Sequence, residues 1–348
     1  MKNNFLDLFR DPPGLRHLKR LTTPTGVIQH ADFDVPDPAH GYSIDDNARA
    51  LIVCLWHYRL FQDASVLSLA EVYFNYLQRV EKEGGSFHNF LSFSEKLLES
   101  EGSEDSIGRA IWVLGEVMAS HADKELTEKA NEIFSRASIE KHLDHPHVRT
   151  KAYILLGLLA AGKLDEAKRW TDKLVAIFNN QSTDDWLWFE DGLFYANGIL
   201  PYALARAARI LQEQTAGEVA IKSFDWLDSL CRLNGQPSPV GQNGWFFKNG
   251  QKATYDQQPL EAADMVLAAT ELYLLTDTQK YLNVASDWFG WYKGNNSQEK
   301  SLIDETTGGI YDAVTPGGVN KNQGAESIVT YLLAYLSIAE LTKNDRTN

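Results

Sequence analysis

Six stretches of the chain are rich in Ala and Leu and would be apolar over most of the circumference of a helix. A helix with so little polar surface must be packed on nearly all sides. Helical periodicity dominates the whole chain, and signals for strands are weak. The sequence therefore predicts an all-helical protein with six buried helices, at Ala48–Leu60, Ile107–Ser120, Lys151–Ala161, Leu200–Leu211, Leu260–Leu275 and Glu326–Leu341.

More amphipathic stretches alternate with the apolar ones, at Ser65–Val80, Glu125–Ser135, Lys163–Phe178, Glu218–Leu230 and Gln279–Trp291. Asn4–Leu18 is the sixth candidate, although Pro12, Pro13 and Gly14 interrupt it. The apolar helices begin at uneven intervals, which argues against a solenoid of fixed period. We expect a closed ring of six inner helices wrapped by outer helices. One domain would span residues 1–348, with 1–24 as an N-terminal arm and 343–348 as a disordered tail.

Charge and composition exclude several classes of function. The formal net charge is −14, and such a surface repels the phosphate backbone of a nucleic acid. No glycine-rich phosphate-binding loop and no membrane-spanning stretch is found. Met1 to Leu21 lacks the apolar run of a signal peptide. Both cysteines, Cys54 and Cys231, lie in apolar contexts typical of buried free thiols. These features predict a cytoplasmic protein without nucleic-acid or membrane partners.

Distinctive polar and aromatic side chains gather in the segments that precede the apolar helices. If the inner helices are parallel, all these segments meet at one mouth of the ring. Aromatic rings can stack on a sugar while carboxylates and amides hydrogen-bond its hydroxyls, and such binding needs no cofactor. Three histidines before the third helix, His142, His145 and His147, could bind zinc, but no nearby Cys or Glu completes such a site. We therefore expect a carbohydrate-binding cleft without a metal.

Glycoside hydrolysis needs two carboxyl groups, one acting as an acid and one as a base or nucleophile. We favour Glu190 as the acid because Trp186, Trp188 and Phe189 surround it in the sequence, and apolar surroundings raise the pKa of a carboxyl. The candidates for the base are Asp46, Asp105, Asp256 and Glu326. Each could instead be a helix cap or a sugar contact.

Further residues are candidates for substrate binding. Tyr42, Trp188, Tyr195 and Trp245 are candidates for stacking on a sugar ring, or else belong to the core. Arg49 and Arg109 follow Asp45 and Asp105 in a repeated Asp-x-x-x-Arg-Ala pattern, and each is expected to neutralise its own aspartate or to contact substrate. The remaining polar candidates are His40, Asp45, Asp191, Asn197, Gln257, Gln258, Asn322 and Gln323.

Five motifs occur in order: GYSIDDNARA (41–50), EDSIGRAIW (104–112), WLWFED (186–191), DQQP (256–259) and NQGAES (322–327). In this set the chain, over about residues 22–342, resembles a bacterial (α/α)6 toroid family of the six-hairpin glycosidase-like superfamily. Members occur alone or fused to glycosyltransferase domains. The resemblance implies an oligosaccharide or glycoside substrate and a glycosyltransferase that acts alongside, but it supplies no catalytic pair.

The leading hypothesis is a glycoside hydrolase that inverts the anomeric configuration, as similar toroids do. A sugar epimerase or isomerase on the same toroid would need two histidines facing each other, and a phosphorylase would need a basic pocket. A non-catalytic glycan-binding module is the third alternative.

Overall fold

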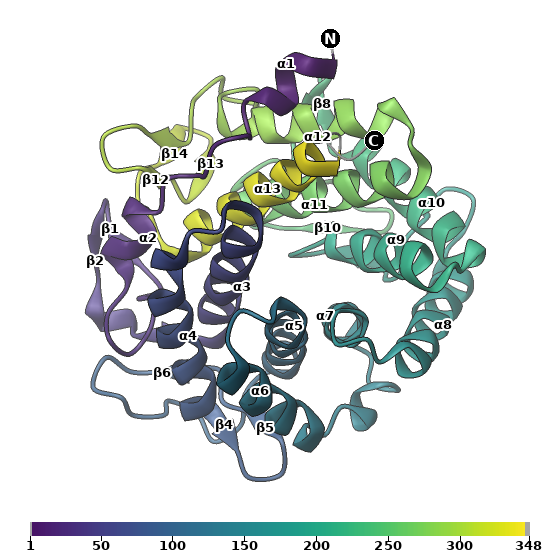
Figure 1. Cartoon of the computed structure of the whole chain (residues 1–348). Coiled ribbons are helices and arrows are strands. Elements are labelled where there is room, and N and C mark those ends of the chain that lie inside the picture. Colours follow the sequence, from purple (N-terminus) through teal and green to yellow (C-terminus); the bar gives the residue numbers. More distant parts are fainter. Residues whose placement is uncertain (1, 345–348) are drawn as a thin grey trace.

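Six apolar helices form a closed inner ring in the computed structural model, which describes residues 2–344 (Figure 1). Each contacts the next along the chain, and the last contacts the first. All six predicted apolar helices are present, and the fold is the predicted (α/α)6 toroid. The inner helices are α3 (Ile44–Phe61), α5 (Glu104–Ser120), α7 (Val148–Ala160), α9 (Ile199–Leu211), α11 (Pro259–Thr276) and α13 (Ala325–Asn344).

The outer layer consists of the amphipathic helices, each packed on the inner helix that precedes it. A helix with one apolar face needs only one packed side, so these helices keep a polar face toward solvent. They are α4 (Leu67–Val80), α6 (Lys124–Arg136), α8 (Leu164–Gln181), α10 (Gln214–Leu230) and α12 (Gln279–Tyr292). Three short 3-10 helices, Pro38–His40, Ala64–Val66 and Glu140–His142, lie in the connections.

The N-terminal arm covers α13, the one inner helix with no outer helix after it in the described chain. It contains α1 (Lys2–Asp7) and α2 (Arg16–Leu21), both of which contact α13. The Phe9 ring packs edge-on against Phe289, and Tyr335 Oη donates to the backbone oxygens of Leu8 and Asp11 at 3.0 Å each. At the other terminus α13 continues through the first two residues of the expected tail, and residues 345–348 lie outside the described part.

Within residues 2–344 the strands are two or three residues long and form two-stranded sheets, which explains the weak strand signals. β7 (Gly192–Leu193) pairs antiparallel with β10 (Phe246–Phe247), and β3 (Tyr42–Ser43) pairs with β6 (Phe90–Leu91). The other pairs are hairpins: β1 (Ala31–Asp32) with β2 (Val35–Pro36), β4 (Glu81–Lys82) with β5 (Ser86–Phe87), β8 (Arg232–Leu233) with β9 (Gln236–Pro237), β11 (Ile303–Asp304) with β12 (Gly309–Ile310), and β13 (Ala313–Thr315) with β14 (Gly318–Asn320).

Glycines allow the inner helices α5 and α7 to approach until their backbones touch. A Cβ placed on Gly157 would lie 2.2 Å from the backbone oxygen of Ile111, and one on Gly115 would lie 2.2 Å from that of Gly157. Cys54 and Cys231 are buried free thiols, as predicted. Within residues 2–344, no helix is both long and apolar enough to cross a membrane.

Candidate functional site

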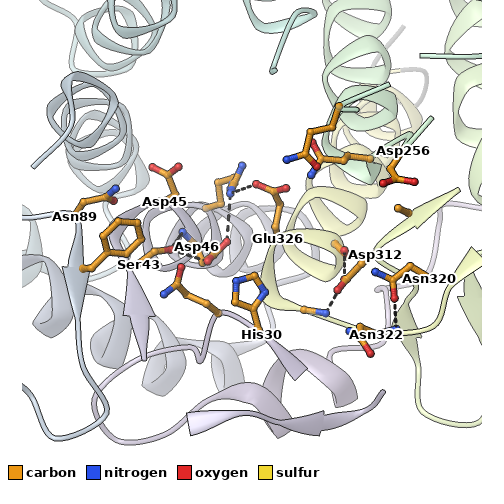
Figure 2. A pocket seen from close by; sticks show the side chains of 18 of the residues that line it. His30, Ser43, Asp45, Asp46, Asn89, Asp256, Asp312, Asn320, Asn322 and Glu326 are labelled. Carbon is orange, nitrogen blue, oxygen red and sulfur yellow. Dashed lines mark hydrogen bonds and ion pairs between the residues drawn. The ribbon is translucent and has the colours of Figure 1, made fainter. Parts of the chain in front are cut away.

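A cavity of about 510 Å³ opens where α3 and α13 begin, and we call it the main cavity. Its walls combine the first turns of these two helices with loops that precede α3, α5, α11 and α13. Figure 2 shows Asp45, Glu326 and Asp256 around it, with Glu326 between the other two. The lining comprises Gln29, His30, Ser43, Asp45, Asp46, Arg49, Asn89, Phe90, Gln242, Asp256, Gln258, Asp312, Ala313, Thr315, Asn320, Asn322, Gly324, Glu326 and Ser327.

Two carboxylates of the main cavity share one guanidinium nitrogen. Arg49 Nη2 donates to Asp46 Oδ1 at 3.3 Å and to Glu326 Oε2 at 3.0 Å, which links α3 to α13. Ser43, the N-cap of α3, accepts from the Asp46 backbone N–H at 3.1 Å, and its hydroxyl donates to Asp46 Oδ2 at 2.6 Å. A capping residue and an arginine one turn into the helix therefore orient the same carboxyl group.

The two carboxyl groups differ in burial. Desolvation raises the pKa of Asp46 to about 6, against the opposing effect of Arg49 and with a further rise from the charge of Glu326. The Glu326 side chain is 37% exposed and open to the cavity. A carboxyl group whose pKa is raised by burial can act as a general acid near neutral pH.

Asp256 and Asp312 occupy the other wall. Within residues 2–344 the Asp256 carboxylate has no hydrogen-bond or ion-pair partner, and it lines the cavity. Asp312 accepts from Ser327 Oγ at 2.6 Å and from the Gly324 backbone N–H at 2.8 Å, and burial raises its pKa. Asp256 is therefore available to a substrate, whereas Asp312 also holds the start of α13.

Two further acids, Glu261 and Asp264, are buried in α11. Glu261 accepts hydrogen bonds from Asn197 Nδ2 at 2.9 Å and from the Ala196 backbone N–H at 2.5 Å. Burial raises the pKa of Glu261 to about 7, and burial together with the charge of Glu261 raises that of Asp264 to about 8. Sequence reasoning missed both, although acids inside an apolar helical stretch are a signal in themselves, because burying an ionisable group is costly.

These raised pKa values predict that stability falls with rising pH. The folded chain keeps protons on Asp46, Glu261 and Asp264 that the unfolded chain releases near pH 4, so their contribution is complete below that pH. It is lost as the pH rises through about 6 to 8. We expect Tm to fall between pH 5 and pH 8.5, and Asp264→Asn to flatten this slope because an amide has no proton to lose. Thermal unfolding across pH measures the effect.

The matched control is Asp277→Asn, a change of the same charge at the exposed C-cap of the same helix. It should shift the whole curve without altering its slope. An identical slope in the wild type and in Asp264→Asn would contradict the assignment.

Seven of the predicted residues line the main cavity: Asp45, Asp46, Arg49, Asp256, Gln258, Asn322 and Glu326. His40 lies in an adjoining cavity. The two other catalytic candidates are outside the lining. Glu190 is ion-paired with Arg149 at 2.6 Å, and Asp105 accepts from Thr150 Oγ1 at 2.9 Å and from Tyr195 Oη. Trp186 contacts Glu190 only through the backbone, with Trp186 Nε1 donating to the Glu190 backbone oxygen at 2.7 Å, and the Glu190 carboxylate is held by Arg149 outside the lining of the main cavity.

The aromatic candidates are mostly part of the core. Trp188 is fully buried and stacks on Trp226 with ring centroids 5.9 Å apart, because the loop folds inward between outer helices. Tyr42 is also buried, and its hydroxyl is 2.9 Å from Thr23 Oγ1. Trp245 is half-buried, while Tyr195 is exposed beside the Arg149 guanidinium. Trp188 and Tyr42 therefore cannot stack on a sugar in this arrangement.

Several polar candidates lie outside the lining of the main cavity. Gln257 is buried among Ser238, Ser297 and Trp291, and Gln323 bonds to Asp304 and Thr307. Asn197 donates to Glu261, and Asp191 accepts from Gln181. The buried amides of Gln257 and Asn197 thus satisfy polar groups of the interior, whereas the contact of Asp191 lies at the surface.

The repeated Asp-x-x-x-Arg pattern does not pair as expected. Arg49 binds Asp46, not Asp45, and Arg109 reaches across to Asp45 on α3, with Nε 3.6 Å from Oδ1. The Arg109 guanidinium also lies over the Tyr153 ring, 4.0 Å from its centroid. The partner of Arg109 lies on a neighbouring inner helix, so the sequence of one helix alone could not reveal it.

Sequence reasoning also missed a glutamate near the three histidines. Glu104 accepts from His142 Nδ1 at 2.5 Å and lies 3.6 Å from His145 Nε2. Even so, residues 2–344 contain no group of three or more His, Cys, Asp or Glu side chains placed to hold a metal ion. Asn89 and Gln242, two cavity residues that were not predicted, come from loops that carry no periodic signal.

Comparison with protein-family models and with curated protein sequences found no match. Among solved structures, the fold is similar to cellobiose 2-epimerase from Bacillus thermoamylovorans, with a TM-score of 0.77 at 11% identity over 98% of this chain and 100% of that one. It is similar to a sugar epimerase from a ruminal bacterium, with a TM-score of 0.73 at 13% identity over 97% and 98% of the two chains.

A third similar structure is the family 76 α-mannanase of Bacteroides thetaiotaomicron, with a TM-score of 0.69 at 11% identity over 99% of this chain and 98% of that one. Identities this low carry the fold and not the reaction. The closed inner ring and these likenesses agree. The protein has the (α/α)6 toroid fold of these structures.

Proposed function

We propose that the protein is a glycoside hydrolase acting on a neutral oligosaccharide or glycoside. The observation that carries this proposal is the convergence of Asp46, Glu326 and Asp256 on one cavity from α3, α13 and the loop before α11. The rest of the lining is rich in amides and hydroxyls, which hydrogen-bond sugar hydroxyls. Arg49 is the single cationic Lys or Arg side chain in the lining, and its charge is shared by two carboxylates.

In this proposal Asp46 is the general acid and Glu326 its partner carboxylate. The raised pKa of Asp46 keeps a proton available near pH 6 for the departing glycosidic oxygen. Arg49 holds Glu326 at the cavity, where its carboxylate can attack the anomeric carbon or activate water. Asp46 Oδ1 and Glu326 Oε2 accept hydrogen bonds from the same Arg49 nitrogen, so the two carboxyl groups lie close together. This arrangement suits the carboxyl separation of about 5–5.5 Å in retaining enzymes better than the about 6.5–9.5 Å of inverting ones.

Inversion, the expectation from the family resemblance, would instead point to Asp256. This residue lies on the other side of Glu326 in Figure 2 and has no protein partner within residues 2–344. The stereochemistry of the product therefore separates the two assignments of the second carboxylate.

A sugar epimerase or isomerase is the second candidate, because toroids of similar fold carry those names. Proton transfer on both faces of a sugar needs two facing bases. His30 is the single histidine in the main-cavity lining, and His40 lies beside it rather than across the cavity. A phosphorylase would need a free basic pocket, and the pairing of Arg49 with two carboxylates argues against one. A glycan-binding module predicts affinity without turnover.

The test is a screen of manno-, gluco- and galacto-oligosaccharides and uronides, with products separated by chromatography and the first-formed anomer identified by NMR. We expect cleavage of a neutral oligosaccharide with retention of configuration. Inversion would instead assign the role of the second carboxylate to Asp256. A product isomeric with an uncleaved substrate would replace hydrolysis by epimerisation, and binding without any product would leave only the glycan-binding module.

A further inference from the structure

A second cavity of about 460 Å³ adjoins the main cavity, and we call it the outer cavity. Its lining is His30, Ala31, Asp32, Asp37, His40 and Asn322, of which His30 and Asn322 also line the main cavity. Figure 2 shows these two shared residues on the same side of the site, below Asp46 and Asp312 in the view. Two shared lining residues make the outer cavity an extension of the site and not a separate depression. Both volumes fall in the range of about 300–1,000 Å³ typical of ligand sites.

We propose that the outer cavity binds the sugar units next to the linkage that is cleaved, so that the substrate is an oligosaccharide chain spanning both cavities. This inference rests on the proposed function. The lining offers two carboxylates, two imidazoles and an amide, and it contains no Lys or Arg. Carboxylates accept hydrogen bonds from sugar hydroxyls but repel phosphates and uronates. The chemistry of the outer cavity therefore selects neutral sugar units.

The wall of the outer cavity is held in place before any ligand arrives. The β1–β2 hairpin is tied to the segment leading into α13, because the Phe33 backbone N–H donates to Asn322 Oδ1 at 3.0 Å and the Gln323 N–H donates to the Phe33 oxygen at 2.9 Å. The Ala325 N–H donates to the Gln29 oxygen at 2.8 Å. A bound sugar would lose little affinity to ordering this wall.

Polar groups of the wall are left available to a ligand. The rings of His30 and His40 meet edge to face with centroids 4.6 Å apart, and His40 Nε2 is 3.4 Å from Asp37 Oδ2. The His40 side chain is still 53% exposed. Asp32 is exposed, and within residues 2–344 its carboxylate has no hydrogen-bond or ion-pair partner. Asp32 and His40 are therefore the side chains to change.

The test is calorimetric binding of manno-oligosaccharides of two, three and four units, and of the matching gluco-oligosaccharides, to a Glu326→Gln variant that blocks turnover. In this background we expect affinity to rise from the disaccharide to the tetrasaccharide by roughly tenfold or more, the effect of one or two added hydrogen bonds. Adding Asp32→Ala and His40→Ala should reduce this ratio to near one.

The matched control adds Asp165→Ala, which removes an exposed acid from the start of α8, at the opposite end of the ring from the site. It should keep the dependence on chain length. Affinity that does not change with length, a ratio unaffected by the double change, or no binding to either series would each overturn the inference. Wild-type product analysis keeps the two proposals apart. Cleavage without length dependence removes only the outer cavity's role, whereas length-dependent binding without cleavage removes the hydrolase.

Discussion

Replacing Glu326 by glutamine is expected to lower kcat roughly 10²–10⁴-fold on the oligosaccharide that the wild type cleaves, the usual range for the loss of a catalytic acid or base. The amide keeps the shape of the side chain and can still contact Arg49, but it can neither attack carbon nor accept a proton. Steady-state kinetics with products followed by chromatography measures the change.

Asp46→Asn tests the proposed acid separately. Its kcat should also fall because the acid is lost, and its residual activity should no longer decline as the pH rises above about 6, where Asp46 gives up its proton in the wild type. The control is Glu340→Gln, which lies on the same helix as Glu326 and breaks an exposed ion pair with Arg59 of α3. It should leave kcat unchanged. Normal turnover by Glu326→Gln would remove Glu326 from the mechanism and make Asp256→Asn the decisive variant.

Adding one methyl group at Gly157 is expected to destabilise the protein by roughly 3 kcal/mol, a typical result of overpacking a tight core. The Cβ of alanine would lie 2.2 Å from the Ile111 oxygen and 2.5 Å from its carbonyl carbon. Both are backbone atoms of a buried helix, so they cannot turn aside as a flexible side chain could. α5 and α7 must separate, and the strain would reach their neighbours in the closed ring. Denaturant unfolding of Gly157→Ala measures the change.

The paired variant is Gly217→Ala on the outer helix α10, where the new Cβ would meet only side-chain carbons at 3.4 and 3.6 Å. Alanine forms helix better than glycine by up to about 1 kcal/mol, so this change should be neutral or stabilising. If Gly157→Ala were as stable as Gly217→Ala, the close contact between α5 and α7 would not be a feature of the protein in solution.

Much of the fold was predictable because the buried positions of a helix are apolar and recur in the sequence with helical spacing. α9 begins one residue before the predicted Leu200, and α11 extends one residue beyond each predicted end. The N-terminal arm was harder to predict because Pro12, Pro13 and Gly14 divide it, and only its contacts with α13 show that it takes the place of an outer helix. Helix ends were predicted less well where caps, such as Ser43, lie ahead of the apolar run.

The candidate site was predicted in part. Asp45, Asp46, Arg49, Asp256, Gln258, Asn322 and Glu326 lie together because acids and amides at the starts of parallel inner helices must meet at one end of the ring. Glu190 does not line the cavity because Arg149 at the start of α7 holds its carboxylate, and Trp188 does not because its ring packs on Trp226 of the outer helix α10. Asp264 was missed because its apolar neighbours in the sequence indicated a buried helix but gave no sign that an acid within it had a role.

The alternation of apolar and amphipathic helices, and the end of the ring where polar side chains collect, follow from the sequence alone, because burial on all sides or on one side imposes a distinct pattern on each helix. The partner of each charged side chain was decided only by the tertiary structure. Asp46 and Glu326 share Arg49, and Arg109 binds Asp45 on another helix. Charges act through space over a few ångströms, and the ring brings together residues from both ends of the chain.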